Sequence, residues 1–375
     1  MRARSAAGFA AGFNAVLEVI TRRPIWVALL GFLLILGTAA GLQRIVKDTS
    51  VEAFVPPGHP ALLANQATTE LFGLTDPIAI AVFSENSVFQ ERNLALIQQL
   101  TDAVAMLPNV RADRVASITS ESSIVGDQGA ILVDPYFDPD NVVAAAEQRW
   151  RAMPPHISTL VSADARGAVI MAELVDPDLA VQTYAAVQKL VASFGQPGVE
   201  IQVAGPAAVS GFLSAAIDAD ARLLQPVVFL IVLTFLYLAF MRAAALAGPL
   251  VVLLGAAGGA LGLMAWHGVP YFAITNALPV ILVAISVADA IHILSAYFER
   301  RALQPERDVR QVVVASVAVM ARPITLTTLT TMAGFAGIAL MSIMPPITYF
   351  AWYATLGVFL AWLFSLFVLP AVLVL

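Results

Sequence analysis

Six long apolar stretches constrain what this chain can fold into more than any motif does. A helix needs about 20 residues to cross a ~30 Å hydrocarbon core, and in lipid only helices and closed barrels satisfy every backbone polar group. The chain is 59% hydrophobic and 12% charged, about half the charged fraction of a soluble globular domain. These features predict a multi-pass α-helical membrane protein with six spans, at residues 24–43, 223–241, 243–266, 273–298, 323–344 and 347–375.

Prolines mark where neighbouring spans separate. Residues 323–375 carry no charge and are too long for one helix. Pro345 and Pro346 are expected to break this stretch, because proline removes a backbone donor and clashes with the preceding turn. The short segment 267–270, which ends in Pro270, is expected to join the third and fourth spans as antiparallel neighbours.

The distribution of arginine predicts the orientation of the spans. Arginines lie before the first span, between the second and third, and between the fourth and fifth: Arg2, Arg4, Arg22, Arg23, Arg242, Arg300, Arg301, Arg307, Arg310 and Arg322. Short segments rich in Lys and Arg stay in the cytoplasm. Both termini are therefore expected to be cytoplasmic, residues 299–322 to form a cytoplasmic connecting helix, and residues 44–222 to lie on the other side.

Residues 1–23 are expected to form a cytoplasmic lead-in to the first span. Apolar side chains recur there at helical spacing, which is typical of an amphipathic helix on a membrane surface. These side chains are Phe9, Phe13, Val16, Leu17 and Ile20. A moderately ordered lead-in without a surface role remains the alternative.

Residues 44–222 are expected to form one extracytoplasmic α+β domain. Strand-like runs alternate with amphipathic helical patterns, an order typical of ferredoxin-like βαβ units. The strand-like runs are residues 78–83, 130–133, 168–175 and 200–203, and the helical patterns are residues 91–107 and 181–194. The segment contains 10 Lys and Arg but 21 Asp and Glu, which argues against nucleic acid or anionic headgroups as partners by charge attraction.

The domain contains no pattern typical of an enzyme. It lacks a Gly-rich phosphate loop, a HExxH motif and a supported Ser-His-acid grouping, and the chain has no cysteine. His59 and His156 each lie beside prolines in expected loops, where a lone histidine is usually structural or solvated. We therefore expect neither catalysis nor a metal or organic cofactor.

Asp289 is the only charged side chain in the middle of any apolar run. A carboxylate at bilayer depth costs a few kcal/mol or more, so it needs a partner, a proton or a water-filled cavity. Ser286, Asp289 and His292 share one helix face at three-residue spacing, and histidine exchanges protons near neutral pH. The pattern predicts a proton relay at Asp289 with Ser286 and His292 beside it. The structural alternatives are a protonated acid bonded across a helix interface and, for His292, an interhelical hydrogen bond.

Two further polar groups are candidates for the same pathway. A threonine-rich run is expected to line the polar cavity, although such hydroxyls also bond their own helix carbonyls; its members are Thr325, Thr327, Thr328 and Thr331. Asp218, Asp220 and Arg222, at the mouth of the second span, are candidates to guide a cation. The alternative for these three is a solvated helix end.

Short motifs along nearly the whole chain carry a family resemblance. They are Arg22-Arg-Pro24, Asp48-Thr-Ser-Val-Glu-Ala-Phe54 with Pro56-Pro57, Phe72-Gly73, Gly205-Pro206, Val287-Ala-Asp-Ala-Ile-His292, Arg322-Pro-Ile-Thr-Leu-Thr-Thr-Leu-Thr-Thr-Met-Ala-Gly-Phe335 and Leu369-Pro-Ala371. In their order and spacing, the chain resembles the amino-terminal half of a resistance-nodulation-cell division (RND) superfamily exporter of the MMPL or hydrophobe/amphiphile exporter type.

The resemblance implies an RND half-transporter in a bacterial inner membrane, with residues 44–222 in the periplasm. In that superfamily one or two adjacent acids in the fourth span take up and release protons. Asp289 occupies the second acid's position and Ala288 the first, so proton stoichiometry does not carry over. The implied activity is proton-motive-force-driven export of a hydrophobic or amphiphilic substrate, with a lipid among the candidates and protons as the coupling ion.

Relatives of this type usually contain two such halves, so the chain is expected to be truncated or, if complete, to pair as a homo-oligomer. Two other functions remain open. One is a protein-export auxiliary of the same superfamily (SecDF-like), whose substrate would be a polypeptide. The other is a sterol-sensing-like regulator that binds lipid without transporting it. Proton dependence separates transporter from sensor, and the bound material separates lipid from peptide.

Overall fold

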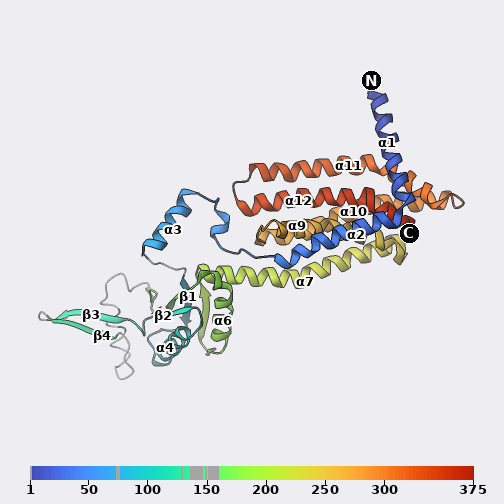
Figure 1. The fold of residues 1–375 in the computed structure, drawn as a ribbon. Coiled ribbons are helices and arrows are strands. Elements are labelled where there is room, and N and C mark those ends of the chain that lie inside the picture. The colour runs from blue at the N-terminus through green and yellow to red at the C-terminus, as the bar shows by residue number, and fades with distance from the viewer. Residues whose placement is uncertain (1, 73–76, 128–129, 136–146, 148–149, 151–159) are drawn as a thin grey trace. The chain divides into compact units, whose positions relative to one another are not determined.

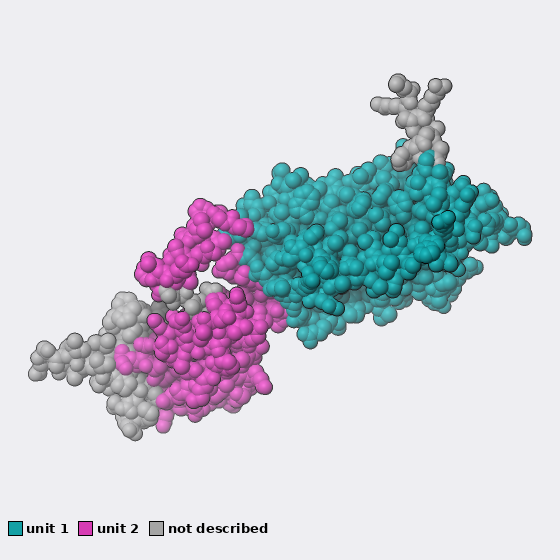
Figure 2. Space-filling model, viewed as in Figure 1, with its two compact units in different colours: residues 1–48, 53–56, 217–375 teal, residues 49–52, 57–216 magenta. Residues whose placement is uncertain are grey.

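The computed structural model describes residues 2–72, 77–127, 130–135, 147, 150 and 160–375. His156 and Gly73, both singled out in the sequence, lie outside these residues. The chain divides into two compact units, coloured separately in Figure 2. The helical unit contains residues 1–48, 53–56 and 217–375, and the sheet unit contains residues 49–52 and 57–216.

Six helices among the described residues are long and apolar enough to cross a membrane, which agrees with the six expected spans. They comprise Pro24–Arg44, Pro206–Phe240, Ala243–Trp266, Ala273–Leu303, Val309–Met341 and Pro345–Val374. Their main helical elements are α2 (Pro24–Ala39), α7 (Pro206–Phe240), α8 (Ala247–Leu253), α9 (Gly259–Trp266), α10 (Ala277–Leu303), α11 (Val309–Met341), α12 (Pro345–Leu363) and α13 (Leu369–Val374). Figure 1 shows the long helices of the helical unit running side by side.

Three helices, α7, α10 and α11, extend beyond their expected bounds. The segment 299–322 is not a separate connecting helix, because it contains the end of α10, a link at residues 304–308 and the first turns of α11. α11 passes through Pro323 and α7 through Pro226. A proline leaves one carbonyl in the preceding turn without its helical donor, and membrane helices tolerate this where neighbouring groups compensate. Pro345 and Pro346, by contrast, stand at the start of α12, where no helical donor is lost.

Two π-helical segments interrupt the third and sixth spans, at Leu254–Gly258 and Phe364–Val368. The segments pack against each other, since a Cβ at Gly255 would lie 2.6 Å from the Phe364 ring. Such a short distance means that only glycine leaves room for this ring. The sequence contains no period that predicts a π-helical turn, so these segments were not expected.

α1 (Arg2–Arg22) leads directly into α2. Its last turns pack on the helical unit, because Leu17 and Ile20 are buried in the cluster that contains Val313 and Val317 of α11. The apolar face expected for a membrane surface is therefore occupied, over these two residues, by protein. This contact anchors the carboxyl end of α1 against the beginning of α11.

The sheet unit contains a four-stranded antiparallel sheet in the order β2-β5-β1-β6. Its elements are β1 (Pro77–Ser84), α4 (Glu91–Ala105), β2 (Val110–Ala116), β5 (Gly167–Leu174), α6 (Ala180–Ala192) and β6 (Val199–Ala204), with α3 (Pro60–Phe72) before them. This chain order and strand order are those of the split βαβ arrangement. Alternate residues of β1 are buried with apolar side chains of α4, so one sheet face carries the core.

One expected strand belongs elsewhere. Residues 130–133 lie in β4 (Ala130–Pro135), which pairs only with β3 (Ser122–Asp127) as a separate hairpin. The remaining strand of the sheet is β2, which the sequence did not indicate. β2 is an edge strand with exposed polar side chains such as Asp113 and Arg114, so it lacks the apolar alternation of a half-buried strand.

Candidate functional site

A groove of about 270 Å³ lies between α10 and α11 and contains Asp289. Its lining residues recur every three or four positions on both helices, the spacing of one helix face. They are Ile285, Ala288, Asp289 and His292 of α10, and Met320, Pro323, Ile324, Thr327, Thr328 and Thr331 of α11. The two faces thus enclose one carboxyl group within a largely apolar lining.

Asp289 is almost fully buried, with 7% of its surface exposed. Its Oδ2 atom is buried and makes no hydrogen bond to any other described residue. Neither of the two ion pairs found in the described part of the chain involves it. A buried polar atom without a partner costs about 1–3 kcal/mol, and a charged one costs more. Asp289 therefore needs a proton, water or a group from outside the described residues.

The structure places the two neighbours of Asp289 differently. His292 lines the groove and is exposed. Ser286 is fully buried outside the groove lining, and its hydroxyl donates a hydrogen bond of 2.6 Å to the Leu282 carbonyl of its own helix. The three residues share a helix face as expected, but only Asp289 and His292 meet in the groove.

Three of the four predicted threonines line the groove. Thr327 and Thr331 donate hydrogen bonds to carbonyls of their own helix, at 2.8 Å to Ile324 and 2.8 Å to Thr327. Thr328 is buried in the lining, with 6% of its surface exposed. Thr325 lies outside it, where its hydroxyl accepts a hydrogen bond of 2.9 Å from the Trp362 indole of α12. One position in the threonine run thus joins two helices instead of facing the groove.

The groove is open along one side. Ala288, His292 and Thr327 are exposed and Thr331 is half-buried, whereas Asp289 and Thr328 are buried deeper in the lining. Sequence analysis missed the apolar lining residues, such as Met320 and Ile324, because apolar side chains carry no chemical signal. Extending the helical period from Thr327 and Thr331 backwards would have indicated them.

A second polar cluster contains Asp218 and Asp220, the candidates to guide a cation. We name it the Tyr271 network, consisting of Lys47, Asp218, Asp220, Gln225, Tyr271 and Asn276. Asp218 forms an ion pair with Lys47. Asp220 accepts a hydrogen bond of 3.3 Å from Asn276, whose own side-chain oxygen accepts one of 3.1 Å from the Tyr271 hydroxyl. Arg222 is exposed and takes part in none of these bonds.

The Tyr271 network joins three parts of the helical unit. Its residues come from the segment after α2, the early membrane part of α7, and the connection into α10. The backbone adds two hydrogen bonds, from Tyr271 N–H to the Val46 carbonyl at 2.7 Å and from Asp48 N–H to the Tyr271 carbonyl at 3.1 Å. Burial raises the pKa of Tyr271 to about 12, so its hydroxyl keeps the proton that it donates to Asn276. These contacts favour a structural role for Asp218 and Asp220.

The described residues contain no group of three or more His, Asp or Glu side chains that could hold a metal ion. The lining of the groove offers the chemistry of a single buried carboxyl beside a histidine and threonine hydroxyls. Such a set can bind and release a proton.

Comparison with known proteins addresses the helical unit. Residues 223–375 match the sequence model of the family described as Patched SSD, a range that includes both faces of the Asp289 groove. A search of curated proteins found no match to the chain. This family is found in RND and MMPL proteins and in sterol-sensing proteins. Patched-like and RND-like membrane proteins are generally transporters rather than enzymes. The match supports an RND-related membrane protein.

Proposed function

We propose that this protein exports a hydrophobic or amphiphilic molecule, with a lipid as the leading candidate, and that the proton-motive force drives the export. The observation that carries the proposal is the buried carboxyl of Asp289, which has no described partner in a groove between two membrane helices. Intramembrane acids are expensive and mark ion pathways by default. The Patched SSD match is compatible with lipid-related transport or sensing.

In the proposed mechanism, protonation of Asp289 changes how α10 and α11 pack. A charged carboxylate draws water or a polar partner into the groove, whereas a neutral carboxyl lets apolar side chains close around it. His292 and Thr328 line the same groove and are placed to pass the proton or to stabilise the charged form. The groove would thus have two arrangements, and the proton would select between them.

α7 is the proposed mechanical link to the sheet unit. Its residue Leu236 is buried in one cluster with Val283 and Val287 of α10, close in sequence to Asp289. α7 is continuous from Pro206, which follows β6 by one residue. A displacement of α10 would therefore displace α7, which is covalently joined to the sheet unit. The sheet unit would take the substrate on the periplasmic side of a bacterial inner membrane, with both termini in the cytoplasm.

The open side of the groove is the proposed contact for a second homologous half or a second copy of this chain. Ala288, His292 and Thr327 are exposed there beside a buried acid, and polar groups at membrane depth usually face protein or a water-filled cavity. A partner on this side would cover the groove and could supply a group to Asp289.

The second candidate is a sterol-sensing-like regulator that binds lipid without moving it, which the Patched SSD match equally favours. A protein-export auxiliary, with a polypeptide substrate, is the third. A regulator would bind lipid independently of protons, whereas both transporters would need proton movement through the groove.

The deciding experiment reconstitutes the protein in liposomes and measures proton influx and movement of a fluorescent phospholipid under a pH gradient. We expect Asp289→Asn to abolish both signals, because the amide keeps the size and hydrogen-bonding capacity of the side chain but cannot titrate. Asp289→Glu should retain part of the activity. Ser286→Ala is the matched control, since Ser286 lies one turn away and bonds only its own helix in the described contacts.

The outcomes separate the candidate functions. Normal transport by Asp289→Asn together with reduced thermal stability of Asp289→Ala would assign the acid to packing and reject the proton relay. Lipid binding without proton influx in the unmodified protein would favour the regulator. A graded loss in His292→Ala would place His292 beside the proton path, and an unchanged rate would assign it to packing.

A further inference from the structure

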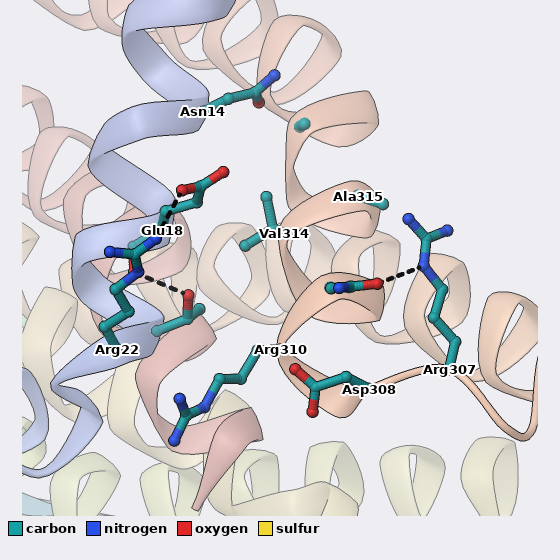
Figure 3. A pocket seen from close by; sticks show the side chains of 11 residues that line it. Asn14, Glu18, Arg22, Arg307, Asp308, Arg310, Val314 and Ala315 are labelled. Atoms are coloured by element: carbon teal, nitrogen blue, oxygen red, sulfur yellow. Dashed lines mark hydrogen bonds and ion pairs between the residues drawn. The ribbon is translucent and has the colours of Figure 1, made fainter.

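A second pocket, of about 630 Å³, lies between the last turns of α1 and the first turns of α11 (Figure 3). None of its lining residues belongs to the Asp289 groove. α1 contributes Glu18, Thr21 and Arg22, and α11 with the link before it contributes Arg307, Asp308 and Arg310. We name it the α1–α11 pocket.

Charges of both signs line the α1–α11 pocket. Three arginines and two carboxylates give it a formal charge of +1. Figure 3 shows Glu18 and Arg22 on the α1 side, Arg307, Asp308 and Arg310 on the α11 side, and Val314 between them. A ligand that carries both a phosphate and an amine would find complementary groups on both walls.

Two of these charged side chains make no hydrogen bond or ion pair with other described residues. Arg22 is paired with Glu18 at 3.5 Å, and Arg307 donates to Gln311 at 3.1 Å and to Gln304 at 2.9 Å. Arg310 and Asp308, by contrast, form no hydrogen bond or ion pair through their side chains in the described part of the chain. Arg310 and Asp308 are thus available to a ligand without loss of a contact, whereas binding by Arg22 and Glu18 exchanges one exposed ion pair, which contributes little to stability, for contacts with the ligand.

The α1–α11 pocket stands at the end of the apolar part of the helices. Arg22 lies two residues before Pro24, where the first apolar span begins. The α11 wall becomes apolar at Val314, Ala315 and Ala318. Further along α11, Val319 and Leu326 are 52% and 54% exposed, and the exposed Arg322 lies between them on the same side. The polar pocket thus lies beside exposed apolar side chains, with one further arginine among them, and a lipid headgroup with its acyl chain requires both kinds of surface.

We propose that the α1–α11 pocket binds the headgroup of a membrane phospholipid that carries an amine, of the phosphatidylethanolamine type. Arg310 and Arg22 contact the phosphate, because the planar guanidinium matches phosphate oxygens in a bidentate geometry. Asp308 and Glu18 accept hydrogen bonds from the ammonium group. Basic pockets between membrane helices are known to bind lipid headgroups. The bound lipid holds α1 against α11 and is distinct from the exported substrate.

The experiment measures lipid binding to the purified full chain by native mass spectrometry in detergent. The added probes are phosphatidylethanolamine, phosphatidylcholine, diacylglycerol and soluble O-phosphoethanolamine. We expect phosphatidylethanolamine to bind, phosphatidylcholine to bind more weakly because its quaternary amine cannot donate hydrogen bonds, and diacylglycerol not to bind at this site. The Arg22→Gln/Arg310→Gln double variant should lose on the order of tenfold in affinity, since charge-assisted bonds to phosphate are removed.

Two controls keep the result interpretable. Arg300→Gln removes one charge in the last turn of α10, outside the pocket lining. This variant should leave binding unchanged. Arg310→Lys keeps the charge without the bidentate fork and should retain part of the affinity, which shows that the pocket is still folded.

Several outcomes would overturn the assignment. Equal binding of phosphatidylethanolamine by the double variant and the unmodified protein would show that Arg22 and Arg310 do not contact the lipid. Equal binding of diacylglycerol would show that only the apolar surface matters, and equal binding of phosphatidylcholine would reject the role of the carboxylates. Full displacement of the lipid by an equal concentration of O-phosphoethanolamine would make this a site for a soluble phosphate compound.

Discussion

At the scale of single residues, Gly262 of α9 illustrates how close two membrane helices come. A Cβ built at Gly262 would lie 1.9 Å from the Thr38 carbonyl oxygen of α2, and one at Gly41 would lie 2.2 Å from the Gly262 carbonyl oxygen. Both distances are far below van der Waals contact. Helix association in lipid depends on such small-residue packing, because lipid tails are as apolar as leucine side chains.

We expect Gly262→Ala to lower the stability of the helical unit by about 1–3 kcal/mol, the usual cost of overpacking. The methyl group meets backbone atoms, so α2 and α9 must move apart. Gly37→Ala is the matched control at the same crossing, since a Cβ there meets no atom within 4 Å. It should be neutral or stabilising by about 0.5–1 kcal/mol. Thermal melting in detergent measures both, and equal effects would contradict the close approach.

At the scale of elements, the Tyr271 network holds the helix ends together where neither hydropathy nor helical period specifies a contact. Asn276 stands at its centre, accepting from Tyr271 at 3.1 Å and from Gln225 at 3.4 Å, and donating to Asp220 at 3.3 Å. Because Asp218 and Asp220 both have partners, they are better placed to fix α7 than to guide an ion. The network therefore joins α7 and the segment after α2 to the connection that leads into α10, the helix that carries Asp289.

We expect Tyr271→Phe to destabilise the protein by about 1 kcal/mol below pH 10, through loss of one hydrogen bond. The folded pKa of Tyr271, about 12, lies above the unfolded value of about 10. The neutral phenol therefore contributes its full stability below pH 10, and this contribution is lost as pH rises through 12. The melting temperatures of the unmodified protein and of Tyr271→Phe should converge or cross as pH rises from 8 to 12, a range of about two units either side of the unfolded pKa. A constant difference over this range would contradict the buried, neutral phenol.

At the scale of the whole molecule, the arrangement of arginine predicts which segments face the cytoplasm. The two units belong to different environments in this prediction, with the acidic sheet unit on one side of the membrane and the link 304–308 on the other. The chain contains no cysteine, so single cysteines can report the orientation without further changes.

We expect a cysteine at position 113, replacing an exposed aspartate of β2, to react with a membrane-impermeant maleimide in intact cells. A cysteine that replaces the exposed Gln304 should react only after the membrane is made permeable. Labelling intensity on a gel measures both. Protection at position 113 with labelling at position 304 in intact cells would reverse the proposed topology.

Local sequence patterns were sufficient for much of the architecture. The six spans follow from uncharged runs of sufficient length, because a lipid environment acts on each segment separately. The βαβ order follows from alternation and helical spacing within single segments, as for β1 and α4. Asp289 stood out for the same reason, since one charge in an apolar run is visible without any knowledge of its neighbours.

Tertiary structure alone decided which side chains meet. The sequence could not separate Thr325, bonded to Trp362, from Thr328, buried in the groove, because both lie in one run. The rotation of α11 about its axis, set by its neighbours, decides which threonine faces the groove. The edge strand β2 and the α1–α11 pocket were equally hidden, since each depends on residues distant in the chain. Hydropathy and period are local properties, whereas a groove, a network or a headgroup pocket is made where separate elements pack.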